Sequence, residues 1–227
     1  MATFGELIAS NSTLSDQEAV HLAALVAEWR LLADLSFADL VLWLPIRKDE
    51  KSWPQGYIAI AQIRPTTAAT VFSDDLIGTK ISWGQRPLID QALSDNQVIK
   101  DTKPVRVGEI MIKEETIPVI YENKTLAIVA RHRNADLMRM PSKLELNYRE
   151  IAHIIFQMVS EGNFPIRNSI YSSESAPRVG DGLIRLDVNG TVFFASPNAR
   201  SALSRVGYQG ELEQKNLGEV FSSLDHG

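Results

Sequence analysis

Apolar residues near the N-terminus recur at the spacing of one helix face. Ser15 comes just before this segment and Glu18 follows three positions later, which is the spacing of a helical capping box. The apolar positions that follow, three or four residues apart, are Leu22, Leu25, Val26, Trp29, Leu32 and Ala33. This pattern predicts an amphipathic helix from about Asp16 to Leu35.

The pattern then changes to short apolar segments that predict β-strands. Residues 37–44 and 57–63 are rich in aliphatic and aromatic side chains and are joined by a polar loop, so they predict an antiparallel hairpin. Residues 116–121 and 126–131 predict a second pair of strands. A sheet of this kind must bury one face, and helices before and after it are the natural cover.

A second helix closes this first domain. Ser142 and Glu145 form another capping-box spacing, and Gly162 is placed to end the helix that they begin. We therefore expect an α+β domain over residues 1–165, in which an antiparallel sheet is flanked by N- and C-terminal helices.

The remainder of the chain predicts a linker and an incomplete second domain. Residues 166–179 are Ser-rich and weakly apolar, as linkers are. Asn189-Gly190 lies between two short apolar segments and predicts a hairpin, and Ser196 begins a short helix. Because two strands and a helix make a marginal core, we expect residues 180–227 to be the N-terminal part of a truncated domain.

The irregular segment of residues 64–108 carries the candidate binding chemistry. Arginine forks, hydroxyl groups and an aromatic ring together suit a planar or anionic small molecule. The candidate ligand-binding residues are Arg64, Thr66, Thr67, Asp75 and Arg86. The alternative is a polar surface loop in which Arg64 pairs with Asp74 or Asp75, whose adjacent carboxylates are poor candidates for acid–base catalysis.

Composition and motifs exclude several functions. With 23 Lys+Arg against 28 Asp+Glu, the net charge of −5 disfavours nucleic-acid binding. The absence of cysteine excludes disulfides, thiolate nucleophiles and Cys-ligated metals, and the four histidines lack metal-binding spacing. Phosphate-binding and hydrolase motifs are missing, so we expect no catalytic residues, metal or cofactor.

The hydropathy of the chain indicates its location. No apolar run approaches the roughly 20 residues that span a bilayer, and the N-terminus lacks the apolar core of a signal peptide. We therefore expect a cytoplasmic protein with no membrane partner.

Several segments, in order along the chain, resemble one protein family. They are LADLSFADL at residues 32–40, AQIRPTT at 61–67, DLIG at 75–78, RPL at 86–88, IPV at 117–119, AIVARH at 127–132, DGLIRLD at 181–187 and FASPNA at 194–199. This ordered set resembles the N-terminal sensor region of the PdtaS family of actinobacterial cytosolic sensor histidine kinases.

The resemblance implies a GAF domain followed by the start of a PAS domain, both sensory, in a two-component system. In the family these domains feed a dimeric kinase core that autophosphorylates a histidine with ATP and phosphorylates an RNA-binding antiterminator response regulator. Here the resemblance ends at about the first third of the PAS domain, and His226 does not match the phosphoacceptor box. ATP is therefore expected only for a kinase domain that this chain does not contain.

Two functions remain open on this basis. The first is a sensor of a small molecule, with cyclic dinucleotides or other nucleotides among the candidates that the family suggests. The second is a ligand-free GAF-type dimerisation module, a homodimer formed through the flanking helices, which an occluded sheet face without a pocket would favour.

Overall fold

The computed structural model describes residues 2–101, 103–107, 109–135, 140–166 and 176–224. The chain divides into a larger unit, Met1–Pro141 with Tyr148–Ala176, and a smaller unit, Ser142–Asn147 with Pro177–Gly227. Most of the predicted linker, residues 167–175, and His226 lie outside the described residues.

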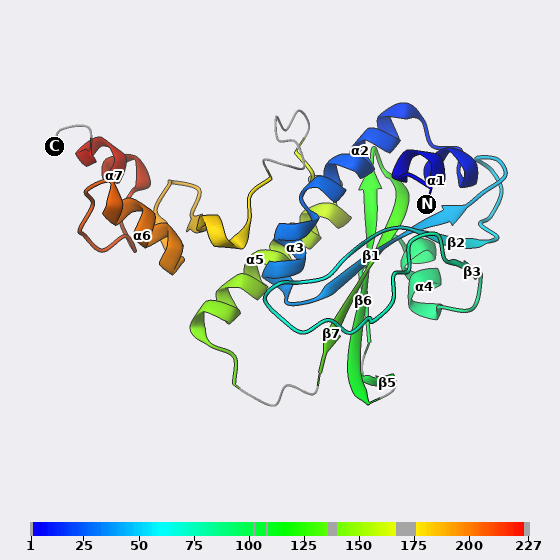
Figure 1. Ribbon diagram of the computed structural model, residues 1–227. Coiled ribbons are helices and arrows are strands. Elements are labelled where there is room, and N and C mark those ends of the chain that lie inside the picture. Colours follow the sequence, from blue (N-terminus) through cyan, green and yellow to red (C-terminus); the bar gives the residue numbers. More distant parts are fainter. Residues whose placement is uncertain (1, 102, 108, 136–139, 167–175, 225–227) are drawn as a thin grey trace. The chain divides into compact units, whose positions relative to one another are not determined.

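The larger unit is built on one antiparallel sheet (Figure 1). Its strands are β1 (Asp39–Ile46), β2 (Gly56–Ile63), β3 (Lys80–Ser82), β4 (Ile99–Lys100), β5 (Val105–Val107), β6 (Ile110–Tyr121) and β7 (Lys124–Asn134). They are arranged in the order β3-β2-β1-β7-β6-β4, and β5 also pairs with β6. Both predicted hairpins, β1–β2 and β6–β7, are confirmed, although β6 and β7 are longer than the sequence predicted.

Helices lie on both faces of this sheet. They are α1 (Phe4–Asn11), α2 (Asp16–Ala27), α3 (Trp29–Ser36), α4 (Pro87–Asp95) and, from Tyr148 on, α5 (Lys143–Ser160). The Ser15 capping box is confirmed, but the predicted single helix is two helices that meet at Glu28. Helix α1 was not predicted, because its eight residues are too few for apolar positions to repeat at helical spacing.

The two faces of the sheet have different covers. Val41 and Trp43 of β1 face α4 and form a core with its Ile89 and Leu93. On the other face, Arg131 of β7 lies with its guanidinium 5.1 Å from the centre of the Phe156 ring of α5. The sheet is therefore a wall between the layer of α4 and the layer that contains α5.

Two buried carboxylates anchor the irregular segment that follows β2. Asp34 of α3 accepts hydrogen bonds from the Thr66 N–H (2.5 Å) and hydroxyl (2.9 Å), and its carbonyl accepts one from the Thr67 hydroxyl (2.7 Å). Asp39 of β1 accepts the Thr70 hydroxyl at 2.5 Å and the Val71 N–H at 2.8 Å. Burial raises the pKa of Asp39, although these two bonds oppose the shift.

The smaller unit contains the predicted second hairpin. Strands β8 (Ile184–Leu186) and β9 (Val192–Ala195) pair, and helices α6 (Pro197–Arg205) and α7 (Leu217–Leu224) follow them. Ser196 caps α6 as predicted, whereas α7 was not predicted. The core of this unit consists of Val192, Ala195, Leu203, Leu212 and Val220.

The Asp34 anchor makes the first testable prediction. Asp34→Ala removes the acceptor of Thr66, and we expect it to lower the free energy of unfolding by about 1–3 kcal/mol. Asp95→Ala is the matched control, because Asp95 is an exposed helical carboxylate and its loss is expected to cost under about 0.5 kcal/mol. Chemical denaturation measures both, and equal effects would contradict the anchoring role.

Candidate functional site

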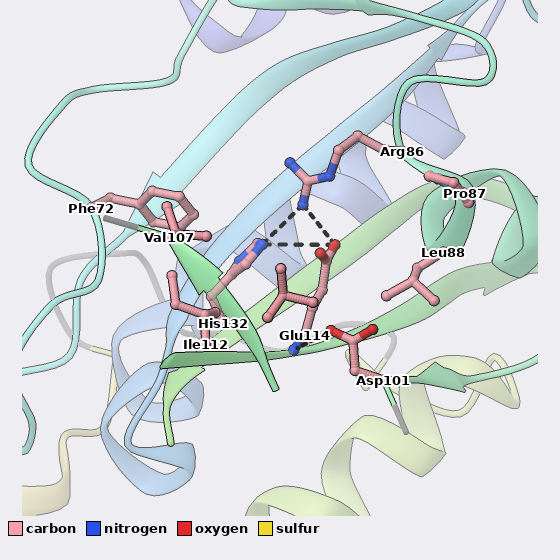
Figure 2. Close-up of a pocket in the computed structure, with 10 residues that line it drawn as sticks. Phe72, Arg86, Pro87, Leu88, Asp101, Val107, Ile112, Glu114 and His132 are labelled. Carbon is pink, nitrogen blue, oxygen red and sulfur yellow. Dashed lines mark hydrogen bonds and ion pairs between the residues drawn. The ribbon is translucent and has the colours of Figure 1, made fainter. Parts of the chain in front are cut away.

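A cavity of about 550 Å³ lies in the larger unit on the α4 side of the sheet (Figure 2). Strands β5, β6 and β7, the start of α4 and the segment after β2 each contribute to it. Most of its lining side chains are apolar, namely Phe72, Pro87, Leu88, Val105, Val107 and Ile112. The polar side chains of the lining are Arg86, Asp101, Glu114 and His132. This is the size and composition of a small-molecule site.

Three of the polar side chains meet in the lining of the cavity. The Nη2 atom of Arg86 is 2.7 Å from Oε1 of Glu114 and 3.1 Å from Nε2 of His132. The same Glu114 oxygen is 3.7 Å from Nε2 of His132, which closes the triangle drawn in Figure 2. We call this group the polar triad.

The fold brings the triad together from three separate segments. Glu114 and His132 are direct cross-strand partners in β6 and β7, so their side chains share one face of the sheet. Arg86 precedes Pro87, the first residue of α4, where proline is favoured. The Thr116 hydroxyl donates a 3.0 Å hydrogen bond to the carbonyl of Leu88 and holds the start of α4 against β6.

Burial determines the charge of the histidine in the triad. It lowers the pKa of His132 from the ordinary 6.5 to about 3, and the charge of Arg86 adds to this effect. His132 is therefore neutral at physiological pH. Because Arg86 can only donate, Nε2 of His132 accepts and the ring proton is on Nδ1.

The surroundings of Glu114 disfavour its charged form. Burial raises its pKa, the neighbouring Asp101 raises it further, and Arg86 opposes both. Asp101 accepts a hydrogen bond from the Glu114 N–H at 3.1 Å, which fixes the two acidic residues side by side. The Glu114 carboxylate is therefore a largely buried group, 14% exposed, and Arg86 is the cation that favours its charged form.

Of the five residues that the sequence nominated, only Arg86 lines the cavity. Thr66 and Thr67 are the partners of Asp34, as described above. The Asp75 carboxylate accepts a 3.0 Å hydrogen bond from the Ile77 N–H within its own turn. These three residues shape the segment after β2 and do not face the cavity.

Arg64 supports the cavity indirectly. Its guanidinium donates to the carbonyl oxygens of Phe72 (3.2 Å) and Asp74 (2.7 Å). The alternative pairing with Asp74 thus involves the backbone carbonyl and not the carboxylate. Phe72 in turn lies edge-on to His132, with ring centres 4.8 Å apart, so Arg64 fixes one wall of the cavity.

Sequence reasoning missed Glu114, His132 and Phe72. The signal available was weak: a histidine between two arginines, and two adjacent acids within an apolar strand. Only the β6–β7 register places Glu114 opposite His132.

Two further features of the described residues concern metals and membranes. Among the described residues, no group of three or more His, Asp or Glu side chains is arranged to hold a metal ion. Likewise, no helix in the described ranges is long and apolar enough to cross a bilayer.

The second prediction concerns the Arg86–Glu114 pair. Arg86→Met leaves a buried carboxylate unpaired, and Glu114→Gln in the same chain is expected to restore about 1–2 kcal/mol of the lost stability. The pair Arg200–Glu213 is the control, because its side chains are 42% and 36% exposed, against 31% and 14% for Arg86 and Glu114. Its coupling free energy, measured in a double-mutant cycle of its own, is expected to be below about 1 kcal/mol. Similar coupling free energies in both cycles would contradict the conclusion that Arg86 neutralises a largely buried carboxylate.

The third prediction follows from the pKa of His132. Between pH 6.5 and 3 the unfolded chain protonates this histidine and the folded chain does not, so stability falls as pH is lowered through that window. The loss is up to about 1.4 kcal/mol per pH unit. His132→Gln removes this contribution and is expected to give a shallower fall in denaturation experiments. The exposed His153, replaced by Gln, is the control, and parallel curves for wild type and His132→Gln would refute a buried neutral histidine.

Comparison with known proteins places the chain in a family. A family model for the GAF domain of the histidine kinase PdtaS matches residues 4–152. The sensor histidine kinase PdtaS of Mycobacterium tuberculosis is 37% identical over 227 residues, covering 96% of this chain and 43% of that relative. Its counterpart in Mycolicibacterium smegmatis is 36% identical over 220 residues with the same coverage. The chain thus spans under half the length of the curated relatives that it matches.

A solved structure agrees with this result. It is described as the sensor region of a sensor histidine kinase, and it superposes with a TM-score of 0.81 at 37% identity. The match covers 96% of this chain and 74% of the solved one. The chain therefore belongs to the PdtaS family of sensor histidine kinases and contains its GAF sensor domain.

Proposed function

We propose that this chain is the signal-receiving part of a two-component kinase and that its GAF domain binds a small molecule in the cavity beside α4. The observation that carries the proposal is the polar triad in the lining of a mostly apolar cavity of about 550 Å³. Ligand sites combine such apolar walls with a few convergent polar groups. Buried groups with perturbed pKa values add support, because they concentrate at functional sites.

The lining residues indicate the chemistry of the ligand. The apolar walls favour a planar or aliphatic body, and Arg86 is the one lysine or arginine among the lining residues that the structure describes. It is already paired with Glu114. A cyclic dinucleotide carries two phosphates and matches this single cation less well than a ligand with one polar group, so we rank it second together with other nucleotides.

A ligand-free dimerisation module is the competing function. A completely filled sheet face would have supported it, whereas the α4 side of this sheet contains a cavity beside its packed core. Dimerisation and ligand binding are nonetheless compatible in one protein. Val20 of α2 and Ile154 of α5 are apolar residues 67% and 39% exposed, which supports a homodimer through the flanking helices.

The wider role follows from the family. In full-length relatives named as sensor histidine kinases, the signal is expected to reach a kinase core that uses ATP and a response regulator of the antiterminator type. The hairpin and helices of the smaller unit are consistent with the start of a PAS domain. These features support a cytoplasmic signalling protein.

Within the larger unit, a series of contacts connects the cavity to helix α3. Phe72 contacts His132 at one end of the segment after β2, and Thr66 and Thr67 attach its other end to Asp34 of α3. A ligand that displaces Phe72 would therefore pull on a helix of the opposite layer. The shift it produces is limited to its difference in affinity for the two arrangements.

The fourth prediction tests ligand binding directly. Thermal unfolding is measured against a panel of nucleotides, cyclic dinucleotides and small aromatic acids. A ligand at 100 times its dissociation constant is expected to stabilise the fold by about 2.7 kcal/mol. Val107→Trp places a large side chain in the cavity from an exposed position and is expected to abolish that shift.

The controls separate the cavity from other surfaces. Val20→Trp, an exposed change on α2, should leave the shift intact. Arg86→Ala should weaken it strongly, while Arg64→Ala should weaken it only through the position of Phe72. A shift that survives Val107→Trp would place the ligand elsewhere, and a flat panel would favour the dimerisation module.

A further inference from the structure

Another cavity of the larger unit, of about 170 Å³, is lined entirely by residues with ionisable side chains. Side chains alternate between the faces of a strand, so Lys113 and Glu115 of β6 lie on the face opposite Glu114 of the triad. Arg131 contacts Phe156 of α5, so this cavity borders the α5 side of the sheet. Its lining residues are Lys100, Asp101, Lys113, Glu114, Glu115, Arg131 and Arg133.

Positive charge exceeds negative charge around this cavity. Four cations and three carboxylates line it, and Arg86 neutralises one of the carboxylates, Glu114, from the other face. Glu115 has two cationic partners, because its Oε1 is 2.9 Å from Nζ of Lys100 and its Oε2 contacts Nη2 of Arg131. With Arg86 counted, five cations and three carboxylates leave a formal charge of +2.

The excess charge is concentrated at one cross-strand pair. Lys113 of β6 and Arg133 of β7 are directly opposite each other, an arrangement in which like charges destabilise a sheet. Within the residues that the structure describes, the Lys113 ammonium makes no hydrogen bond or ion pair. Burial lowers the pKa of the neighbouring Arg131, a shift that Glu115 opposes. The charges of Arg133 and of Arg149 in α5 lower that pKa further, so the cations repel one another.

We propose that this cavity is an anion site, separate from the ligand cavity of the triad, and that it binds a phosphate dianion between Lys113 and Arg133. A phosphate group carries about −1.5 to −2 charges near neutral pH, which matches the excess charge of the lining. Its oxygens accept charge-assisted hydrogen bonds from ammonium and guanidinium groups alike. The Cβ atoms of direct cross-strand partners lie about 4.5–5.5 Å apart, so both side chains can reach one phosphate.

The size of the cavity limits what it can enclose. Sites for drug-sized ligands have volumes of about 300–1,000 Å³. At about 170 Å³ this cavity suits a free phosphate ion, or the phosphate group of a monoester whose remainder stays outside, better than a whole nucleotide.

Matched anions test the charge that the site requires. Phenyl phosphate is a dianion at about pH 8, and phenyl sulfate has the same body with one charge. Titration calorimetry of the full chain at constant ionic strength measures both, together with inorganic phosphate. We expect the phosphates to bind and phenyl sulfate to bind at least about 10-fold more weakly. The tighter of the two phosphates identifies the source, an ester or the free ion.

Variants locate the anion. The double variant Lys113→Met with Arg133→Met is expected to weaken phosphate binding about 10- to 100-fold. Lys80→Met with Arg106→Met is the control, because it removes the same charge from exposed positions of β3 and β5 in the same sheet. It should change the affinity less than about 2-fold. Val107→Trp, which fills the triad cavity, should retain phosphate binding, and thermal melts show whether each variant is folded.

The outcomes separate this anion site from the proposed function. Equal losses in the two double variants would mean that phosphate responds only to overall charge, and would overturn the site. Equal affinities for phenyl phosphate and phenyl sulfate would overturn the assignment to a dianion. Loss of binding in Val107→Trp would place the anion in the triad cavity instead. Binding of none of the three anions would overturn the anion site and leave the triad cavity standing, because the ligand panel tests that cavity independently.

Discussion

The hydrogen bonds that buried Asp34 and Asp39 accept are the interactions on which the site depends. The segment after β2 has little regular structure of its own, so its backbone groups need partners outside a helix or sheet. Two carboxylates, from the end of α3 and the start of β1, provide acceptors for Thr66, Thr70 and Val71. This arrangement fixes one end of the segment, and Arg64 fixes the other by binding backbone carbonyls. Phe72 is thereby held as a wall over the sheet, and the space beneath it stays open.

The cost of burying charged groups explains the electrostatics of the cavity. Apolar walls make every charge inside costly, so a buried acid needs a cation and a buried histidine stays neutral. Arg86 meets both requirements from one atom, because Nη2 contacts Glu114 and His132 together. A site built this way responds to any ligand that competes for Arg86. The response can then spread through Phe72 to the anchored segment and to α3.

Local sequence signals predicted the elements of this fold well. The Ser15 capping box and the β1–β2 and β6–β7 hairpins are all determined by residues close together in the chain. The break at Glu28 was not visible, because the apolar spacing continues across it.

The site was predicted only in part because it depends on contacts between distant residues. Thr66 and Thr67 look like ligand donors in sequence, yet their hydroxyls are used by Asp34, more than thirty positions away. Glu114 and His132 become a pair only through the register of β6 against β7, which a single sequence does not reveal. Arg86 was nominated as one of the arginines of the irregular segment of residues 64–108, and it is the nominated residue that lines the cavity.

The central claim is that the cavity beside α4 receives the signal, and chemical-shift mapping tests it most directly. Backbone amide spectra of the isotopically labelled chain would be recorded during titration with a library of small molecules. The account predicts that binders perturb amides around Arg86, Glu114 and His132 first, with smaller changes at Thr66 and Thr67. Perturbations confined to other surfaces, with these amides unchanged, would contradict it.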